Sequence, residues 1–137
     1  MERTGTAHWA GTGKEGKGHV STQSSVLKEA QYSYLTRFEN GIGTNPEELI
    51  AAAHSGCFSM KLSFLVTAAG FTPQSIDTKA TVTLENGAIP KIHLETVAVV
   101  AGLSDEKFQE LAADAKVNCP ISKLLNTEIS LSAELKA

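Results

Sequence analysis

The sequence predicts an α+β fold in which the elements follow one another in the order βββ-α-ββ-α-β. Three observations predict it: one long apolar helical pattern over residues 46–69, a pair of alternating stretches over 76–84 and 92–100, and a second helical pattern followed by a last alternating stretch over 129–135. Strands and helices occur in runs instead of alternating regularly, which is typical of a segregated α+β chain. With 137 residues, the chain is expected to form one domain, residues 1–137.

The N-terminal part is rich in glycine, serine and threonine. Residues 6–10 and 19–22 are expected to be strands on either side of a glycine-rich turn at residues 11–17. Residues 32–35 are expected to form a third strand, and residues 36–39 to lead into a loop.

The helix expected over residues 46–69 has clear start and stop signals. Asn45 suits the N-cap, Pro46 the first helical position, and Glu48 stands at the capping-box spacing from Asn45. Gly70 suits the residue that ends a helix. About 24 residues at a rise of 1.5 Å make a helix of about 36 Å. Its apolar side chains surround the axis on nearly all sides, which is typical of a buried helix.

The alternating stretches that follow this helix predict further strands. Residues 76–84 and 92–100 each place their apolar side chains on one face, and residues 86–90 join them as a hairpin. Residues 129–135 alternate in the same way and predict the last strand.

A second helix is expected between the hairpin and the last strand. Ser104 suits its N-cap, and its apolar face continues to about Lys116. Pro120 cannot continue that helix but can start a new one, so a short helix is expected over residues 121–125.

Composition excludes several classes of protein. The net charge of −3 provides no basic field for nucleic acid, and 42% hydrophobic residues make a packed core feasible. The first 20 residues lack the apolar segment of a secretory signal. The longest apolar stretch, residues 49–69, is interrupted by polar side chains, so no membrane span is expected. Two cysteines without a secretory signal indicate cytoplasmic thiols.

Each cysteine has two interpretations. Cys57 lies within the long helix, where it is either a buried inert thiol or a nucleophile that needs a nearby cation. Cys119 precedes Pro120 at a helix start, where exposed amides favour a thiolate. The alternative is that Cys119 is a helix-boundary residue buried in the core. Local chemistry therefore ranks Cys119 as the better-activated thiol. The two form no CxxC pair, so any bridge between them depends on the fold.

Arg37 and Glu47 are candidate partners of a thiolate. Arg37 is followed by Phe38, and a guanidinium in an apolar site keeps its charge; the alternative is a surface arginine. Glu47 can orient such an arginine through a salt bridge that uses both carboxylate oxygens. The alternative for Glu47 is an interaction with the helix dipole.

A zinc site is a weaker interpretation. His54 and Cys57 have an H-x-x-C spacing, and Cys119 and His93 would have to complete the ligand set, but no second closely spaced pair exists. Residues 41–43 lack the third glycine of a dinucleotide-binding fingerprint. We therefore expect neither a metal nor another cofactor.

Two motifs resemble those of the OsmC/Ohr family, the osmotically inducible protein C and organic hydroperoxide resistance proteins. Residues 44–60, TNPEELIAAAHSGCFSM, resemble the signature helix of that family, and residues 118–122, NCPIS, resemble its second signature. Residues 7–9, 36–39 and 70–78 are closer to the OsmC branch than to the Ohr branch. The resemblance covers nearly the whole chain.

The resemblance implies an intertwined homodimer with two long central helices, which reduces organic hydroperoxides by cysteine chemistry in oxidative and osmotic stress defence. It implies that Cys57 attacks the peroxide and that Cys119 resolves the product as a Cys57–Cys119 disulfide, which reverses the local ranking. Glu47 and Arg37 match the family's glutamate and arginine. An external dithiol, such as a lipoylated protein, would reduce the disulfide.

Helix geometry constrains how such a site is built. Glu47 and Cys57 are ten positions apart, which is about 15 Å along one straight helix. Either the helix breaks near residues 51–53, or the two groups come from different subunits or segments, and we expect a site at a dimer interface. The rival function is a non-enzymatic dimeric binding protein for a small apolar ligand, with structural thiols.

Overall fold

The computed structural model describes residues 1–136, and Ala137, the last residue of the expected domain, lies outside the described residues. Its contacts divide the chain into two compact units, Met1–Leu49 and Ile50–Ala137. Each unit has a three-stranded sheet, and the elements are mixed α and β as expected.

The sheet of the N-terminal unit is antiparallel, in the order β1 (Gly5–Ala10), β2 (Lys17–Thr22), β3 (Ala30–Tyr32). The first two strands confirm the prediction. Trp9 pairs with Gly18 across the sheet, and the Trp9 and Tyr32 rings lie 5.3 Å apart. Gly18 leaves the space that these two rings fill.

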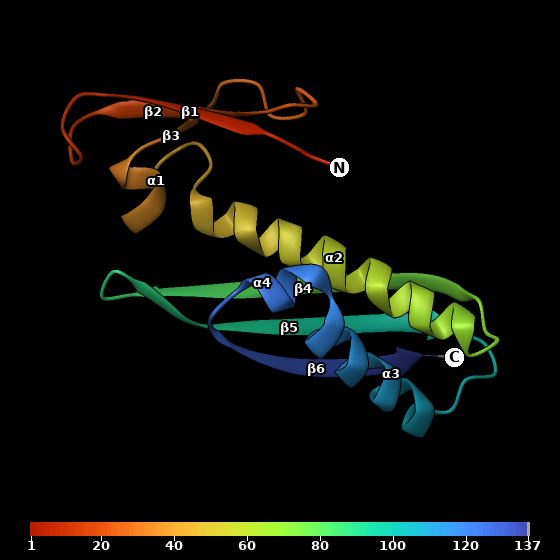
Figure 1. Cartoon of the computed structure of the whole chain (residues 1–137). Helices are drawn as coiled ribbons and strands as arrows, with labels where there is room; N and C mark the ends of the chain where they lie inside the picture. The colour runs from red at the N-terminus through yellow and green to blue at the C-terminus, as the bar shows by residue number, and fades with distance from the viewer. Residues whose placement is uncertain (137) are drawn as a thin grey trace. The chain divides into compact units, whose positions relative to one another are not determined.

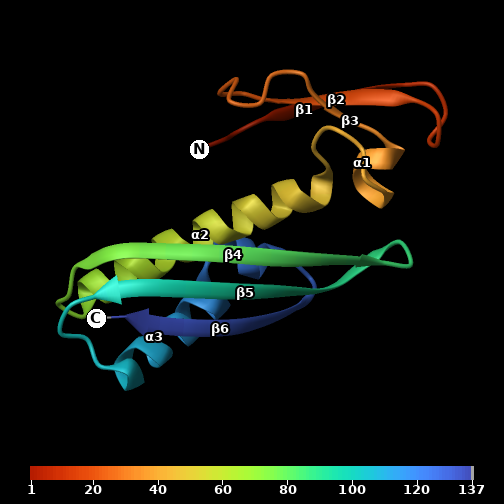
Figure 2. The same ribbon diagram turned by 180° about the vertical axis from the view of Figure 1, so that it is seen from behind.

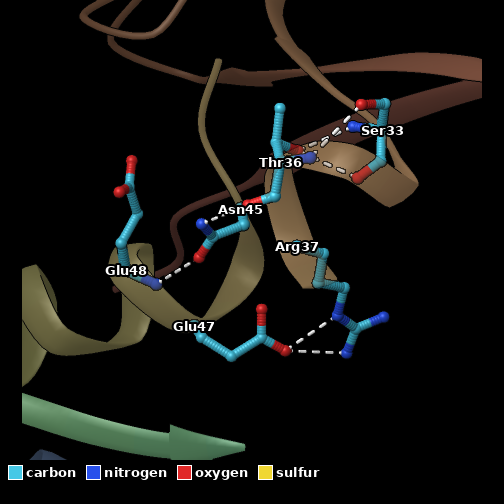
Figure 3. Close-up of polar contacts among 6 residues, drawn as sticks. All are labelled: Ser33, Thr36, Arg37, Asn45, Glu47 and Glu48. Atoms are coloured by element: carbon cyan, nitrogen blue, oxygen red, sulfur yellow. Dashed lines mark hydrogen bonds and ion pairs between the residues drawn. The ribbon is translucent and has the colours of Figure 1, made fainter. Parts of the chain in front are cut away.

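The third strand ends earlier than predicted. The strand expected over residues 32–35 is wrong beyond Tyr32, because Tyr34–Phe38 forms the short helix α1. The Thr36 amide donates to Ser33 Oγ, and the Ser33 amide donates to Thr36 Oγ1 at 2.8 Å (Figure 3). This capping box satisfies the free amides of a helix start, so it outweighs the β preference of the tyrosines.

The long helix α2 (Pro46–Ala68) confirms its predicted start and ends one residue early. The Glu48 amide donates to Asn45 Oδ1 at 2.7 Å, whereas the Glu48 side chain accepts from the Thr44 hydroxyl, so only half of a capping box forms. Gly70 has φ +94°, the left-handed conformation that ends many helices. The helix is unbroken, so the break considered near residues 51–53 does not occur.

Within the described chain, α2 is buried on one side only. Phe58, Leu62 and Val66 are fully buried, but Met60 and Phe64 are 64% and 67% exposed. The expectation of a helix buried all round is therefore wrong for the single chain. Contrary to the sequence-based exclusion, the length and composition of α2 would allow it to cross a membrane. In its apolar 18-residue window, 22% of the residues are buried. The core helix of a soluble protein can pass the same test.

The sheet of the C-terminal unit has the order β4 (Pro73–Glu85), β5 (Ala88–Val100), β6 (Glu128–Lys136). A hairpin joins β4 to β5 through Asn86 and Gly87 alone, with φ +50° and +73°. This turn is tighter than the expected loop over residues 86–90, because two left-handed residues match the twist of the strands.

Strand β6 runs parallel to β5, so the chain must cross over between them. The crossover contains α3 (Asp105–Asn118), capped by Ser104 as predicted, and α4 (Pro120–Leu124). Figures 1 and 2 show α3 and α4 on the same face of the sheet as the C-terminal part of α2. The core lies between these helices and the sheet, and its largest fully buried residues include Phe58, Phe108, Leu62, Ile92 and Leu94.

Candidate functional site

The fold brings the two cysteines together. Cys57 lies on α2 and is half-buried, and Cys119 lies between α3 and α4 and is fully buried. Both are free thiols, and their side chains interact directly. A Cys57–Cys119 disulfide requires that the two thiols lie near each other.

Cys119 occupies the junction of two helices. Its amide donates to the Ala115 carbonyl at 3.0 Å and closes α3, while its own extended conformation makes it the N-cap of α4. The following Pro120 disfavours a helical conformation at Cys119 and then suits the first position of α4. As an N-cap, the Cys119 sulfur accepts a hydrogen bond from the Ser122 amide at 3.3 Å.

The environment of Cys119 favours its thiolate. Burial alone would raise the pKa of Cys119, but hydrogen bonds from the Ser122 hydroxyl and amide, Cys57 and the Ile121 amide outweigh it and lower that pKa. The Ser122 oxygen lies 3.4 Å from the sulfur. The local ranking of Cys119 as the better-activated thiol therefore agrees with the geometry.

The environment of Cys57 acts in the opposite direction. Burial raises the pKa of the Cys57 thiol, and Cys119 raises it further. The Ile121 amide and the ammonium of Lys61 lower it, but less. Lys61 stands four positions along α2, on the same helix face as Cys57. Within this unit, Cys57 thus needs further positive charge to become the more reactive thiolate.

His54 is a buried titratable residue beside the thiols that our sequence analysis treated only as a possible zinc ligand. Its Nε2 lies 2.7 Å from Ser122 Oγ, and its buried Nδ1 has no hydrogen-bond partner among residues 1–136. Burial lowers the pKa of His54, so the imidazole is neutral at neutral pH. Sequence reasoning missed Ser122 as a site residue. The sequence signal that could have identified Ser122 is its position three residues after the N-cap Cys119, because a side chain at that position can reach back to the N-cap residue.

In the N-terminal unit, Arg37 and Glu47 form an ion pair. Nε and Nη2 of Arg37 both lie 2.8 Å from Oε1 of Glu47 (Figure 3). The expected salt bridge with both carboxylate oxygens is wrong, because Oε2 is buried and has no hydrogen-bond partner in the described part of the chain. The Asn45 side chain donates to the Thr36 carbonyl at 2.8 Å, and so ties α1 to the start of α2. These contacts hold the guanidinium and the carboxylate together.

Arg37 also faces a hollow of about 250 Å³ in the same unit. Its lining is largely aromatic and consists of Trp9, Gly13, Tyr32, Ser33, Tyr34, Arg37 and Phe38. A guanidinium beside aromatic rings can hold an oxygen-containing group and an apolar group at the same time.

The zinc ligand set does not assemble in the part of the chain that the structure describes. No three His, Cys, Asp or Glu side chains gather closely enough there to hold a metal. His93 hydrogen-bonds instead to Ser130 at 2.6 Å and Ser132 at 3.2 Å.

The chain is thus an α+β protein with a pair of thiols. One thiol lies on a long helix, and the second lies near it at the start of a short helix. Residues 39–134 match the family described as OsmC-like protein. The chain belongs to this OsmC/Ohr family, as its motifs indicated.

Relatives and solved structures agree with this membership. The chain is 48% identical to Peroxiredoxin OsmC of Escherichia coli, over 100% of this chain and 99% of that protein. It is 30% identical to the organic hydroperoxide resistance protein OhrB of Bacillus subtilis, over 87% and 89% of the two chains. The crystal structure of an organic hydroperoxide resistance protein from Elizabethkingia anophelis is similar, with TM-score 0.72, 28% identity and 99% of each chain covered.

Proposed function

We propose that this chain is a cysteine-based peroxidase that reduces organic hydroperoxides to alcohols in oxidative and osmotic stress defence. The observation that carries the proposal is the direct interaction of Cys57 with Cys119 in a chain 48% identical to a protein named peroxiredoxin. Such a pair can complete a redox cycle with no metal or flavin.

In the first step, the Cys57 thiolate attacks the terminal oxygen of the hydroperoxide. An S–O bond forms, the O–O bond breaks, and the alkoxide takes a proton and leaves as the alcohol. Cys57 is thereby oxidised to a sulfenic acid.

In the second step, the Cys119 thiolate attacks the Cys57 sulfur. The S–S bond forms, the S–O bond breaks, and hydroxide takes a proton and leaves as water. An external dithiol, for which we propose a lipoylated protein or a small dithiol, then reduces the disulfide by exchange and becomes a disulfide itself.

Arg37, held in place by Glu47, would supply the positive charge that Cys57 needs. Because α2 is unbroken, Glu47 and Cys57 of one chain are ten residues, or about 15 Å, apart along it. We therefore assign the Arg37–Glu47 pair at each Cys57 to the other subunit of a homodimer. There Arg37 would stabilise the thiolate and the charge that develops on the peroxide, and Glu47 would hold Arg37.

The exposed face of α2 supports the dimer. Met60 and Phe64 present large apolar side chains on a helix that its own chain covers on one side only. A second copy of the chain would bury this face symmetrically. We propose that the dimer works in the cytoplasm, where thiols stay reduced, without a membrane or nucleic-acid partner.

The substrate class follows from the apolar surroundings of the candidate groups. Phe38 lies next to Arg37 and lines the aromatic hollow, with Trp9 and Tyr34. Such a lining favours a hydroperoxide with an organic substituent over hydrogen peroxide.

One experiment separates the peroxidase from a non-enzymatic binding protein. Reduced protein is mixed with one equivalent of cumene hydroperoxide, and free thiols and cumyl alcohol are counted. Loss of two thiols for each alcohol released supports the peroxidase. Unchanged thiols with bound, unreduced hydroperoxide would show that the chain only binds an apolar ligand.

A further inference from the structure

Three buried groups of the C-terminal unit form a continuous chain of polar contacts. His54 Nε2 lies 2.7 Å from Ser122 Oγ, and Ser122 Oγ lies 3.4 Å from Cys119 Sγ. His54 and Cys119 are fully buried, and Ser122 is 8% exposed. Water is thus kept from all three, so they depend on one another for hydrogen bonds.

The Ser122 hydroxyl has a single proton for these two neighbours. It donates to Cys119 only if His54 does not need that proton, which requires His54 to carry its own proton on Nε2. The other tautomer would place an N–H on Nδ1, which is buried and meets no acceptor from the residues that the structure describes. Orphaned buried N–H groups are rare in proteins, so the Nε2–H tautomer is favoured.

With this tautomer, the donors in the series of contacts from His54 through Ser122 to Cys119 all point towards the sulfur. His54 donates to Ser122 Oγ, and Ser122 donates to Cys119 through both its hydroxyl and its amide. A sulfur that receives two donors is better matched as a thiolate than as a thiol.

We propose that His54 is a positioning residue that turns the Ser122 hydroxyl proton towards Cys119 and so holds Cys119 as the thiolate that closes the disulfide. The inference rests on the proposed function in one respect, the resolving role of Cys119. His54 keeps its proton throughout; the Cys119 sulfur forms the S–S bond, and the departing hydroxide takes a proton and leaves as water.

Among residues 1–136, few titratable or charged groups affect the pKa of Cys119. Cys57 faces it from α2, and Lys61 acts on Cys57 from one turn further along the same helix. From α4, the groups that act on Cys119 are Ser122 and the amide of Ile121, which carry no charge. Burial lowers the pKa of His54, consistent with a neutral imidazole that serves as a donor.

The test titrates Cys119 alone, in a Cys57→Ser background, by the ultraviolet absorbance of its thiolate. Adding His54→Phe or Ser122→Ala should raise the Cys119 pKa by about one unit or more, the effect of losing one hydrogen bond to a charged group. His54→Gln keeps a donor N–H in a side chain of similar length and should restore much of the shift. Ser122→Ala changes the packing least, so it provides the test if His54→Phe does not fold.

The outcomes separate this inference from the proposed function. If Ser122→Ala raises the Cys119 pKa, but His54→Gln raises it as much as His54→Phe does, the role assigned to the imidazole N–H is wrong. If neither Ser122→Ala nor His54→Phe moves the pKa, the inference fails whether or not the protein consumes peroxide. A full shift in the Cys57→Ser background, combined with a chain that has both cysteines and leaves cumene hydroperoxide intact, would instead keep the positioning role and refute the peroxidase.

A second readout uses the chain with both cysteines. After rapid mixing with cumene hydroperoxide, His54→Phe should slow disulfide closure about tenfold relative to sulfenic acid formation at a pH below the Cys119 pKa of the unsubstituted chain. Equal slowing of both steps would indicate a general structural defect and contradict the positioning role.

Discussion

Nε and Nη2 of Arg37 share one oxygen of Glu47, Oε1, at 2.8 Å each. The carboxylate is mostly buried and the guanidinium is half-exposed, so the glutamate is the fixed member and the arginine the member that can reach a ligand. A rigid acid that orients an accessible base has the geometry of a positioning pair.

Glu47→Gln should reduce kcat/KM for cumene hydroperoxide by about tenfold to a hundredfold, because the amide weakens a charge-assisted hydrogen bond to Arg37. Glu48→Gln is the matched control, since Glu48 is exposed on the same helical turn and its carboxylate bonds, among residues 1–136, only to the Thr44 hydroxyl. Steady-state peroxide consumption measures both variants. An equal loss in the two would point to a damaged helix start and not to the ion pair.

Substitution of each cysteine tests the assigned roles. Cys57→Ser should abolish peroxide consumption, whereas Cys119→Ser should complete one turnover and retain an oxidised Cys57. Mass spectrometry of the Cys119→Ser variant should detect one added oxygen, or one added dimedone when that reagent is present. An inert Cys119→Ser and an active Cys57→Ser would reverse the two roles, as the lowered pKa of Cys119 alone would suggest.

The buried His54 predicts a loss of stability in acid. Burial lowers its folded-state pKa from 6.5, so below pH 6.5 the unfolded chain binds a proton that the folded chain does not. The contribution to the free energy of unfolding is therefore complete above pH 6.5 and falls as the pH drops towards the folded-state pKa. Urea denaturation at several pH values should show that His54→Gln loses this component. His8→Gln is the control, because His8 is exposed, and an equal change in both variants would contradict the assignment.

The exposed face of α2 predicts an effect on assembly. Phe64→Lys should convert a dimer into monomers and lower peroxidase activity, because a charge would enter an apolar interface. Val26→Lys, at another exposed apolar side chain, is the control. Sedimentation velocity reads out the oligomeric state; a wild-type chain that is monomeric throughout would refute the dimer.

Gly18 predicts a local stability effect in the N-terminal sheet. A Cβ at this position would lie 2.5 Å from Trp9 Cε3 and 2.6 Å from the His8 carbonyl oxygen. Gly18→Ala should therefore lower the free energy of unfolding by about 1–3 kcal/mol. Gly13→Ala, where a Cβ would meet nothing within 4 Å, should change it far less. Thermal denaturation compares the two, and equal values would contradict the packing argument.

Most elements could be predicted from the sequence, because their signals are local. The caps at Asn45 and Ser104 and the proline at residue 120 act within one helical turn, so they mark helix starts without tertiary information. The prediction failed at residues 34–35, where the Ser33–Thr36 capping box competed with a tyrosine-rich strand pattern. Two local preferences of similar size cannot be ranked from composition alone.

The sequence by itself determined the two cysteines as candidates, the α+β fold class and the family. Only the tertiary structure decided that the two thiols meet, that Ser122 and His54 lie behind Cys119, and that Arg37 uses a single oxygen of Glu47. The physical reason is distance along the chain. Caps and periodicity act over a few residues, whereas the pKa of a thiol depends on donors and charges that packing brings from other elements.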